Sequence, residues 1–304
     1  MKYFLKSILK TIPVLLLITL IVFLLMRVTG DPVSLMLPET ATEEERDSLR
    51  EALGFNEPLP VQYLTYLGDL VQGNFGDSFR YNTDALALIL ERLPATLELA
   101  IASMVIAIII SVPLGILSAV KRNSFFDLFI TGGAVLGKAM PSFWLGIMLI
   151  LILSVTFQFF PVSGRGTLGH LVLPALTLGT GIAAEMTRLI RSSMLEILGQ
   201  DFIRTARSKG LGEAIIVNKH AFRNALIPVV TIMALQTSTL IGGTLITETV
   251  FAWPGLGQLL VQSVNLRDMA VVQAATFIIA VFVIVSNLTA DMIYRFLDPR
   301  IKYD

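Results

Sequence analysis

The sequence predicts an all-α integral membrane protein with six membrane-spanning helices. Of its 304 residues, 54% are hydrophobic and only 15% are charged, and the mean hydropathy is +0.75. A soluble domain carries about 25% charged residues. This chain has fewer charged residues and more apolar side chains than the core of a soluble domain can bury. The formal net charge is zero, which gives no indication of nucleic-acid binding.

Six apolar stretches supply the predicted spans. A hydrocarbon layer of about 30 Å requires roughly 20 apolar residues in helical form. The first stretch is short but extends through Ile8 and Val28, and Pro174 is expected to break the fourth. None shows the polar alternation of barrel strands. The stretches are 11–26, 99–120, 139–164, 166–184, 224–247 and 269–290.

The first stretch also has the basic start of a cleaved signal peptide. Arg27-Val28-Thr29-Gly30-Asp31 follows it, however, without a small-x-small cleavage pattern. We therefore interpret 1–30 as a tail and a retained first span.

Basic residues predict the orientation in the membrane. The N-terminus, the second and fourth connections and the C-terminus together hold 15 basic residues, whereas the short connections on the other side hold only Arg165 and Arg267. Because basic residues favour cytoplasmic connections, both termini are expected in the cytoplasm.

The first external connection, 31–93, holds 12 of the 23 acidic residues against four basic ones. The pattern Thr42-Glu43-Glu44-Glu45 predicts a helix start, with Leu49, Leu53 and Phe55 on its apolar side and Gly54 at its end. The segment is either a structured cap over the helix ends or a docking surface for an external partner, and the two interpretations are compatible.

The connection 191–223 is the most informative polar stretch. Phe202, Ala206 and the group 215–217 are spaced as in two short amphipathic helices, and Gly210 lies where the first can end with a positive φ. A basic loop that lies against anionic lipid is one interpretation. Two short helices separated by a glycine instead favour a rigid cytosolic element that contacts a partner protein.

Motifs along the whole chain support a specific resemblance. Two lie in this connection: Arg204-Thr205-Ala206-Arg207-Ser208-Lys209-Gly210-Leu211 and His220-Ala221-Phe222-Arg223-Asn224-Ala225-Leu226-Ile227-Pro228. The others, in order, are Gly30-Asp31-Pro32, Gln62-Tyr63, Gly73-Asn74-Phe75-Gly76-Asp77-Ser78, Pro94-Ala95-Thr96-Leu97-Glu98-Leu99, Trp253-Pro254-Gly255-Leu256-Gly257 and Asp298-Pro299-Arg300. Together they resemble the binding-protein-dependent ABC transporter permeases of the subfamily that imports dipeptides, oligopeptides and nickel chelates.

The resemblance implies a type I importer permease fold, MetI-like, with a core at 94–304. It identifies 191–223 as the ATPase-contacting "EAA" loop, although Arg204-Thr205-Ala206 replaces Glu-Ala-Ala and Arg223 stands where the general motif has proline. This variant is typical of the first of two paired permeases. The coupling residues it implies are Arg204, Thr205, Ala206, Lys209, Gly210, Leu211, Glu213 and His220.

The resemblance also implies the partners and the mechanism. They are a second homologous permease, two subunits that bind ATP and magnesium, an extracytoplasmic substrate-binding protein and the lipid of a bacterial or archaeal inner membrane. Closure of the ATP-binding subunits would move the helix around 204–213 as a lever and open the path outward.

Polar residues within the spans are candidates for the path. Lys138 either snorkels to the cytoplasmic interface or lines the path, and Glu185 either pairs with Arg188 one turn later or acts as a gate. Glu248 and Asp291 are expected at interfaces. Candidates in the fifth span are Gln236, Ser238 and Thr239, which either join helices or line a wet path. Trp253-Pro254-Gly255 is interpreted as a re-entrant external turn in preference to an interfacial Trp anchor.

One nucleotide-binding pattern is rejected. The stretch from Gly132 to Ala139 nearly fits the phosphate loop, but Ala139 replaces the hydroxyl residue that holds Mg²⁺ and no strand precedes it. The spacing of Gly133 and Gly137 instead suits close helix packing. We expect no cofactor and no metal in this chain.

Two other classes of protein are weighed against a permease. An intramembrane enzyme would need converging catalytic groups, yet His170 and His220 fall on opposite predicted sides, which excludes a triad that uses both. The absence of cysteine excludes disulfides and thiolate metal sites. A membrane scaffold would use the basic loop without transport. For a permease the cargo stays open between di- or oligopeptides, nickel or other metal chelates, and glutathione.

Overall fold

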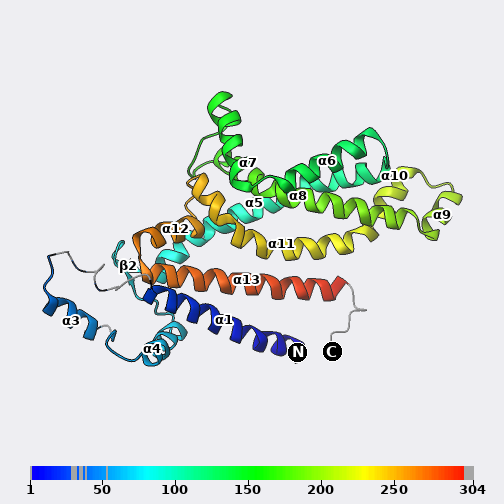
Figure 1. The fold of residues 1–304 in the computed structure, drawn as a ribbon. Helices are drawn as coiled ribbons and strands as arrows, with labels where there is room; N and C mark the ends of the chain where they lie inside the picture. The colour runs from blue at the N-terminus through cyan, green and yellow to red at the C-terminus, as the bar shows by residue number, and fades with distance from the viewer. Residues whose placement is uncertain (1, 29–32, 34–36, 38–39, 53, 298–304) are drawn as a thin grey trace. The chain divides into compact units, whose positions relative to one another are not determined.

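The computed structural model describes residues 2–28, 33, 37, 40–52 and 54–297. These residues form helices joined by turns, with one hairpin in which β1 (Asp77–Ser78) pairs antiparallel with β2 (Thr83–Asp84) (Figure 1). The sequence motifs at 30–32 and 298–300, and Leu53, lie outside the described residues. The chain divides into two compact units, 1–94 with 255–284 and 95–254 with 285–304.

The first unit has a small apolar core. Phe75, Leu88 and Ile89 pack with Leu259 and Val271, and all of these side chains are buried. The Phe75 and Phe277 rings meet at 5.6 Å between centroids. The helices that contribute to this unit are α1 (Lys2–Val28), α3 (Glu43–Ala52), α4 (Leu59–Val71), the start of α5 (Ala85–Val120), α12 (Leu256–Leu266) and much of α13 (Met269–Leu297).

The predicted helix start at Thr42 is confirmed. The amide of Glu45 donates to Thr42 Oγ1 at 3.3 Å, and the amide of Thr42 donates to Glu45 Oε2 at 2.8 Å. This reciprocal capping box satisfies two amides that the first turn of a helix leaves free. Gly54, with φ of 70°, follows the end of α3 as expected.

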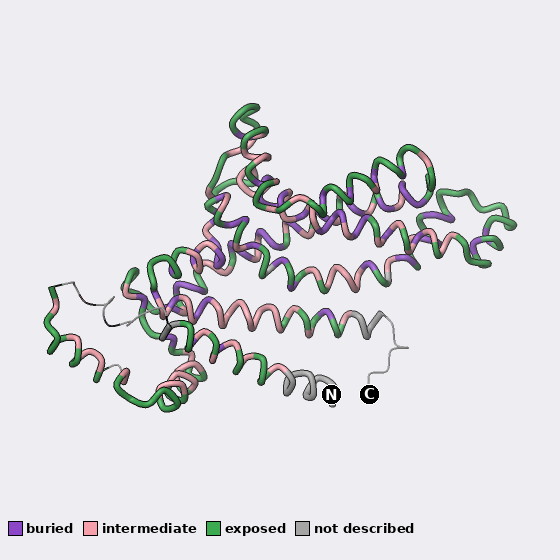
Figure 2. Tube along the Cα trace, in the orientation of Figure 1, coloured by how far each residue is buried: buried purple, intermediate pink, exposed green. Residues whose placement is uncertain are grey.

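The second unit is organised around one long helix. α8 runs beside both α6 and α11 (Figure 1), and buried and exposed residues alternate along these helices (Figure 2). Met186, Ile190 and Met194 of α8 are completely buried in its largest apolar cluster. Besides the rest of α5, the elements are α6 (Phe125–Ala139), α7 (Ser142–Leu149), π-helix η1 (Ile150–Thr156), α8 (Leu168–Leu198), α9 (Asp201–Ser208), α10 (Glu213–Ile215), π-helix η2 (Ile216–Ala221) and α11 (Phe222–Val250).

The helical class is confirmed, and several helices suit a bilayer. Three described segments are long and apolar enough to cross a membrane: Ala85–Val120, Leu168–Leu198 and Met269–Ile293. Two bent pairs bring the number to five if each counts as one span: Phe125–Ala139 with Ser142–Thr156, and Pro228–Leu240 with Gly242–Val250. Thr11–Leu25 is a shorter apolar helix. The predicted number of six spans stays a prediction.

Two prolines act differently from what the sequence predicts: the chain bends next to Pro141, whereas the helix continues through Pro174. The chain bends by 105° between α6 and α7, where Met140 is extended with ψ of 129° because it precedes Pro141. The third span was predicted at 139–164. The bent helical pair observed there begins at Phe125 and ends at Thr156. The expected break at Pro174 is wrong: Pro174 is buried within a continuous α8, near the start of that helix.

Two glycines permit close approach of the helices in this unit. A Cβ at Gly179 would lie 2.8 Å from the carbonyl oxygen of Ser103, and a Cβ at Gly115 would lie 2.7 Å from the Ile190 side chain. The predicted role of Gly133 is wrong, since a Cβ there has open space around it, whereas a Cβ at Gly137 would make ordinary contact with Thr180 and Ala184. The α5–α8 contact therefore depends on glycine more than the α6–α8 contact does.

We predict that Gly179→Ala destabilises the protein while Gly181→Ala does not. The carbonyl of Ser103 cannot move without moving α5, so the added methyl costs about 1–3 kcal/mol. Gly181, two residues along α8, has nothing within 4 Å and serves as the matched control. Thermal unfolding of the purified variants checks this, and equal melting temperatures for the two would contradict it.

Candidate functional site

The connection after α8 forms a compact elbow, defined here as residues 201–221. α9 ends in a Schellman motif, in which the amide of Gly210 donates to the carbonyl of Arg207 at 2.9 Å and the amide of Leu211 donates to the carbonyl of Ala206 at 3.3 Å. Gly210 has φ of 74°, so the positive φ predicted there is confirmed. The two predicted short helices are present as α9 and as α10 with η2.

One side of the elbow is packed against the end of α8. Ile203 and Ile216 are completely buried and Ala206 nearly so, in the same apolar cluster as Met194. Ala221 is also buried there. The elbow is therefore continuous with the core of its unit.

The other side of the elbow exposes apolar side chains. Phe202, Leu211 and Ile215 are 42%, 37% and 48% exposed. α9 buries Ile203 and Ala206, three residues apart, whereas Phe202, which the sequence pattern grouped with Ala206, lies on the exposed side. The i, i+3 spacing was present in the sequence and could have identified Ile203.

An ion pair braces the turn of the elbow. Arg207 Nε donates to Glu213 Oε1 at 2.7 Å across Gly210. The hydrogen bond from Arg207 lowers the pKa of the Glu213 carboxyl, and the same contact raises the pKa of Arg207. The coupling residues chosen from the sequence include Glu213 but not Arg207, although Arg207 stands in the quoted motif 204–211.

The remaining predicted coupling residues lie on the same elbow. Arg204 pairs with Asp201 at 3.4 Å, and Thr205 Oγ1 donates to the Asp201 carbonyl. Lys209 is exposed at the end of α9. The His220 carbonyl accepts a hydrogen bond from Asn224 Nδ2 at 2.6 Å. The structure thus brings the predicted set together within one short segment.

A buried carboxylate ties α6 to α8 before the elbow begins. Asp127 is 4% exposed and accepts hydrogen bonds from Arg191 Nε at 2.7 Å and Arg191 Nη2 at 2.8 Å. It also accepts from the Ser118 hydroxyl of α5 and from the amide of Asn123. Sequence reasoning missed this network because its central pair, Asp127 and Arg191, lies 64 residues apart in the sequence.

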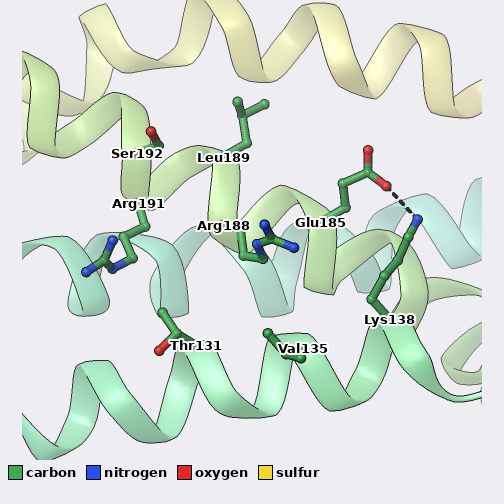
Figure 3. A pocket seen from close by; sticks show the side chains of 8 residues that line it. All are labelled: Thr131, Val135, Lys138, Glu185, Arg188, Leu189, Arg191 and Ser192. Atoms are coloured by element: carbon green, nitrogen blue, oxygen red, sulfur yellow. Dashed lines mark hydrogen bonds and ion pairs between the residues drawn. The ribbon is translucent and has the colours of Figure 1, made fainter.

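A second ion pair joins the same two helices. Lys138 Nζ of α6 lies 2.7 Å from Glu185 Oε2 of α8 (Figure 3). Of the two interpretations of Glu185, the pair with Arg188 on its own helix is wrong, because the kink at Pro141 ends α6 with Lys138 opposite Glu185. The interpretation as a gate stays a prediction. Both residues line an open cavity of about 770 Å³ between α6 and α8, which Arg188 and Arg191 also line.

The polar residues of α11 do not line this cavity. Ser238 is buried, and its hydroxyl donates to Asn287 Oδ1 of α13 at 2.7 Å, so it joins two helices. Gln236 is half-buried and Thr239 is exposed. Of the five predicted path residues, only Lys138 and Glu185 therefore meet.

The turn after α11 is built on a buried tryptophan. Trp253 is 1% exposed, and its indole Nε1 donates to the carbonyl of Ala95 at 2.8 Å. This burial argues against an exposed interfacial anchor. Pro254 lines a cavity of about 490 Å³ with Glu98 and Arg165, which are ion-paired, and Gly255 precedes α12.

Glu248 and Asp291 lie in different surroundings. Glu248 was expected at an interface, but it is completely buried and accepts a hydrogen bond from Thr96 Oγ1 at 2.7 Å, because α5 passes beside the end of α11. Asp291 is exposed on α13. The stretch 132–139 is helical within α6, so it forms no phosphate loop.

We predict that Asp127→Asn lowers the melting temperature far more than Asp291→Asn. Losing the carboxylate leaves the Arg191 guanidinium partly buried without its counter-charge, at a cost of about 3 kcal/mol. Asp291 is exposed on α13 and provides the same substitution outside the network. Melting temperatures measured in detergent test this, and a similar small effect for both variants would contradict it.

Comparisons with known proteins agree along the whole chain. Residues 111–303 match the family model described as binding-protein-dependent transport system inner membrane component, and residues 1–100 match the N-terminal model of the same system. The chain is 45% identical to the oligopeptide transport system permease protein AppB of Bacillus subtilis, with 99% of each chain covered. It is 38% identical to the dipeptide permease DppB of Escherichia coli K12 and 41% identical to the glutathione permease GsiC of Pectobacterium atrosepticum, with at least 99% of each covered.

Solved structures show the same fold. The inward-facing MetNI methionine ABC transporter aligns with a TM-score of 0.59 at 21% identity, covering 69% of this chain and 96% of that chain. An amino acid ABC transporter crystallised with histidines aligns with a TM-score of 0.55 at 16% identity, covering 69% and 94%. The MetI-like permease fold expected from the motifs is confirmed.

The functional class follows from these matches. The chain is a membrane-embedded, multi-pass permease subunit and not a catalytic enzyme, and ATP hydrolysis belongs to a separate subunit. A substrate-binding protein and an ATPase are its general partners. The chain belongs to the family of binding-protein-dependent transport system inner membrane components, the permeases of ABC importers.

Proposed function

We propose that the chain forms one half of a translocation path for di- and oligopeptides, paired with a second homologous permease. The full-length similarity to an oligopeptide permease and a dipeptide permease supports this cargo. Glutathione is an alternative, favoured by the similarity to a glutathione permease. Nickel and other metal chelates are further alternatives within the subfamily that the sequence motifs resemble.

The proposed assembly has two ATP-binding subunits on the cytoplasmic side and a binding protein outside. The excess of basic residues in the termini and in the second and fourth connections supports cytoplasmic termini and a cytoplasmic elbow. On this orientation the acidic segment 31–93, with α3 and α4, faces outward and is the proposed docking surface for the binding protein. The segments 1–30 and 94–304 are then the first span and the permease core.

The observation that carries the coupling proposal is the two-sided packing of the elbow. Ile203 and Ile216 are buried with the end of α8, whereas Phe202, Leu211 and Ile215 face outward. An exposed apolar group of this kind suits contact with another protein. Closure of the ATP-binding subunits would therefore move the elbow and α8 together, and hydrolysis would reset them.

The path itself is proposed to involve polar residues at the inner and outer ends of the core. Lys138, Glu185, Gln236 and Thr239 are the candidate lining residues, and Ser238 supports them by joining α11 to α13. The turn of Trp253, Pro254 and Gly255 is the candidate outer gate. The burial of Trp253 supports a turn fixed to the start of the core rather than a mobile flap.

Peptide uptake by the assembled transporter tests the cargo. Proteoliposomes that contain both permeases, the ATPases and the binding protein are expected to accumulate labelled dipeptide when ATP is present, and to take up a nickel chelate or glutathione at background rates. Uptake of the chelate alone, or of glutathione alone, would contradict the peptide assignment. Failure of the chain to copurify with a second permease would contradict the proposed pairing.

We predict that Gly210→Ala lowers the uptake obtained per ATP hydrolysed, while Gly212→Ala does not. Gly210 has open space around it, so the cost comes from the positive φ and is about 1–2 kcal/mol of local stability in the elbow. Gly212 has equal space and an ordinary φ of −65°, which makes it the matched control. Transport and ATP hydrolysis measured in the same proteoliposomes give the ratio, and an unchanged ratio in an assembled Gly210→Ala transporter would contradict the lever.

A further inference from the structure

The cavity between α6 and α8 has one cation that its own ion pairs do not neutralise. Lys138 is paired with Glu185, and Arg191 is paired with Asp127, which is not among the residues that line the cavity. Arg188 lies on α8 between these two pairs (Figure 3), and among the described residues no hydrogen bond or ion pair engages its guanidinium. The cavity therefore carries a net positive charge at an exposed arginine.

The cavity lies just beyond the predicted fourth span, 166–184, so the inference rests on the proposed orientation, which puts this part of α8 at the cytoplasmic interface. The apolar part of α8 ends at Glu185, and Arg188 and Arg191 follow within two turns, before the elbow starts at Asp201. Arg188 lies about 15 Å from the end of α8 at 1.5 Å per residue. A cation at this depth, where the apolar sequence stops, meets the layer of lipid headgroups.

The α6 side of the cavity continues into an exposed apolar stripe. Val135 lines the cavity and is 55% exposed, and Leu128 and Leu136 are 72% and 66% exposed. Thr131 also lines the cavity, and its hydroxyl donates to the Asp127 carbonyl at 2.6 Å. The arrangement places a cationic pocket beside a surface that suits acyl chains.

We propose that this cavity is a binding site for an anionic phospholipid, whose phosphate is held by Arg188 while its acyl chains lie along the exposed stripe of α6. A guanidinium donates two parallel hydrogen bonds to phosphate oxygens. The ligand would bridge α6 and α8 just before the elbow. A soluble phosphate would use the cation but not the stripe, so the combination favours lipid.

Lipid retained by the assembled transporter tests the site. The complex is reconstituted in nanodiscs with equal phosphatidylglycerol and phosphatidylcholine, re-extracted in mild detergent, and its bound lipid is quantified by mass spectrometry. The wild-type complex is expected to be enriched in phosphatidylglycerol, and Arg188→Gln is expected to lower that enrichment about fivefold. Lys121→Gln removes the same charge from the exposed α5–α6 turn outside the cavity and is expected to change it little.

A second variant separates loss of the site from loss of folding. Ser192→Glu adds a negative charge to the cavity lining while keeping every cation, and it is expected to reduce phosphatidylglycerol in the same way. Equal retention of both lipids by the wild-type complex, or wild-type enrichment in both Arg188→Gln and Ser192→Glu, would overturn the proposal. Displacement of the bound lipid by millimolar inorganic phosphate would assign the site to a free anion, and displacement by the transported dipeptide would assign it to the path; either result would overturn the lipid assignment.

Discussion

The buried carboxylate of Asp127 joins α5, α6 and α8, and the packing of the second unit depends on this junction. It accepts two hydrogen bonds from Arg191 of α8, one from Ser118 of α5 and one from the backbone of the α5–α6 turn. Three helices therefore meet at one charged group. In an apolar surrounding an unpaired charge is costly, so the network favours the single arrangement in which every donor reaches the carboxylate.

That arrangement supports the coupling role proposed for α8. The carboxylate fixes α8 at Arg191, close glycine contacts fix it against α5 at Gly115 and Gly179, and Ile203 and Ile216 extend its apolar core into the elbow. The Schellman motif at Gly210 and the pair of Arg207 with Glu213 then keep the turn closed. Rigid elements with continuous packing are what a mechanical link between an ATPase and a membrane helix requires.

The local features of this fold were predictable from the sequence because their causes are local. Apolar length predicts the helices, Thr42 and Glu45 predict a capping box, and Gly210 predicts a helix end with positive φ. The partners of buried charges were not predictable in this way. Glu185 had an available arginine one turn away, yet it pairs with a lysine 47 residues earlier, because the kink at Pro141 determines where α6 ends. The position of Glu248 was also predicted wrongly, because its hydrogen-bond partner Thr96 is 152 residues away in the sequence.

The central claim is that the elbow and α8 behave as one rigid body. The chain contains no cysteine, so cysteines introduced at Leu168, at the start of α8, and at Lys219, in the elbow, can carry spin labels without further changes. Pulsed electron paramagnetic resonance on the assembled transporter measures the distance between the two labels with and without ATP. The account predicts one narrow distance distribution that ATP leaves unchanged; a broad distribution, or a distance that shifts with ATP, would contradict it.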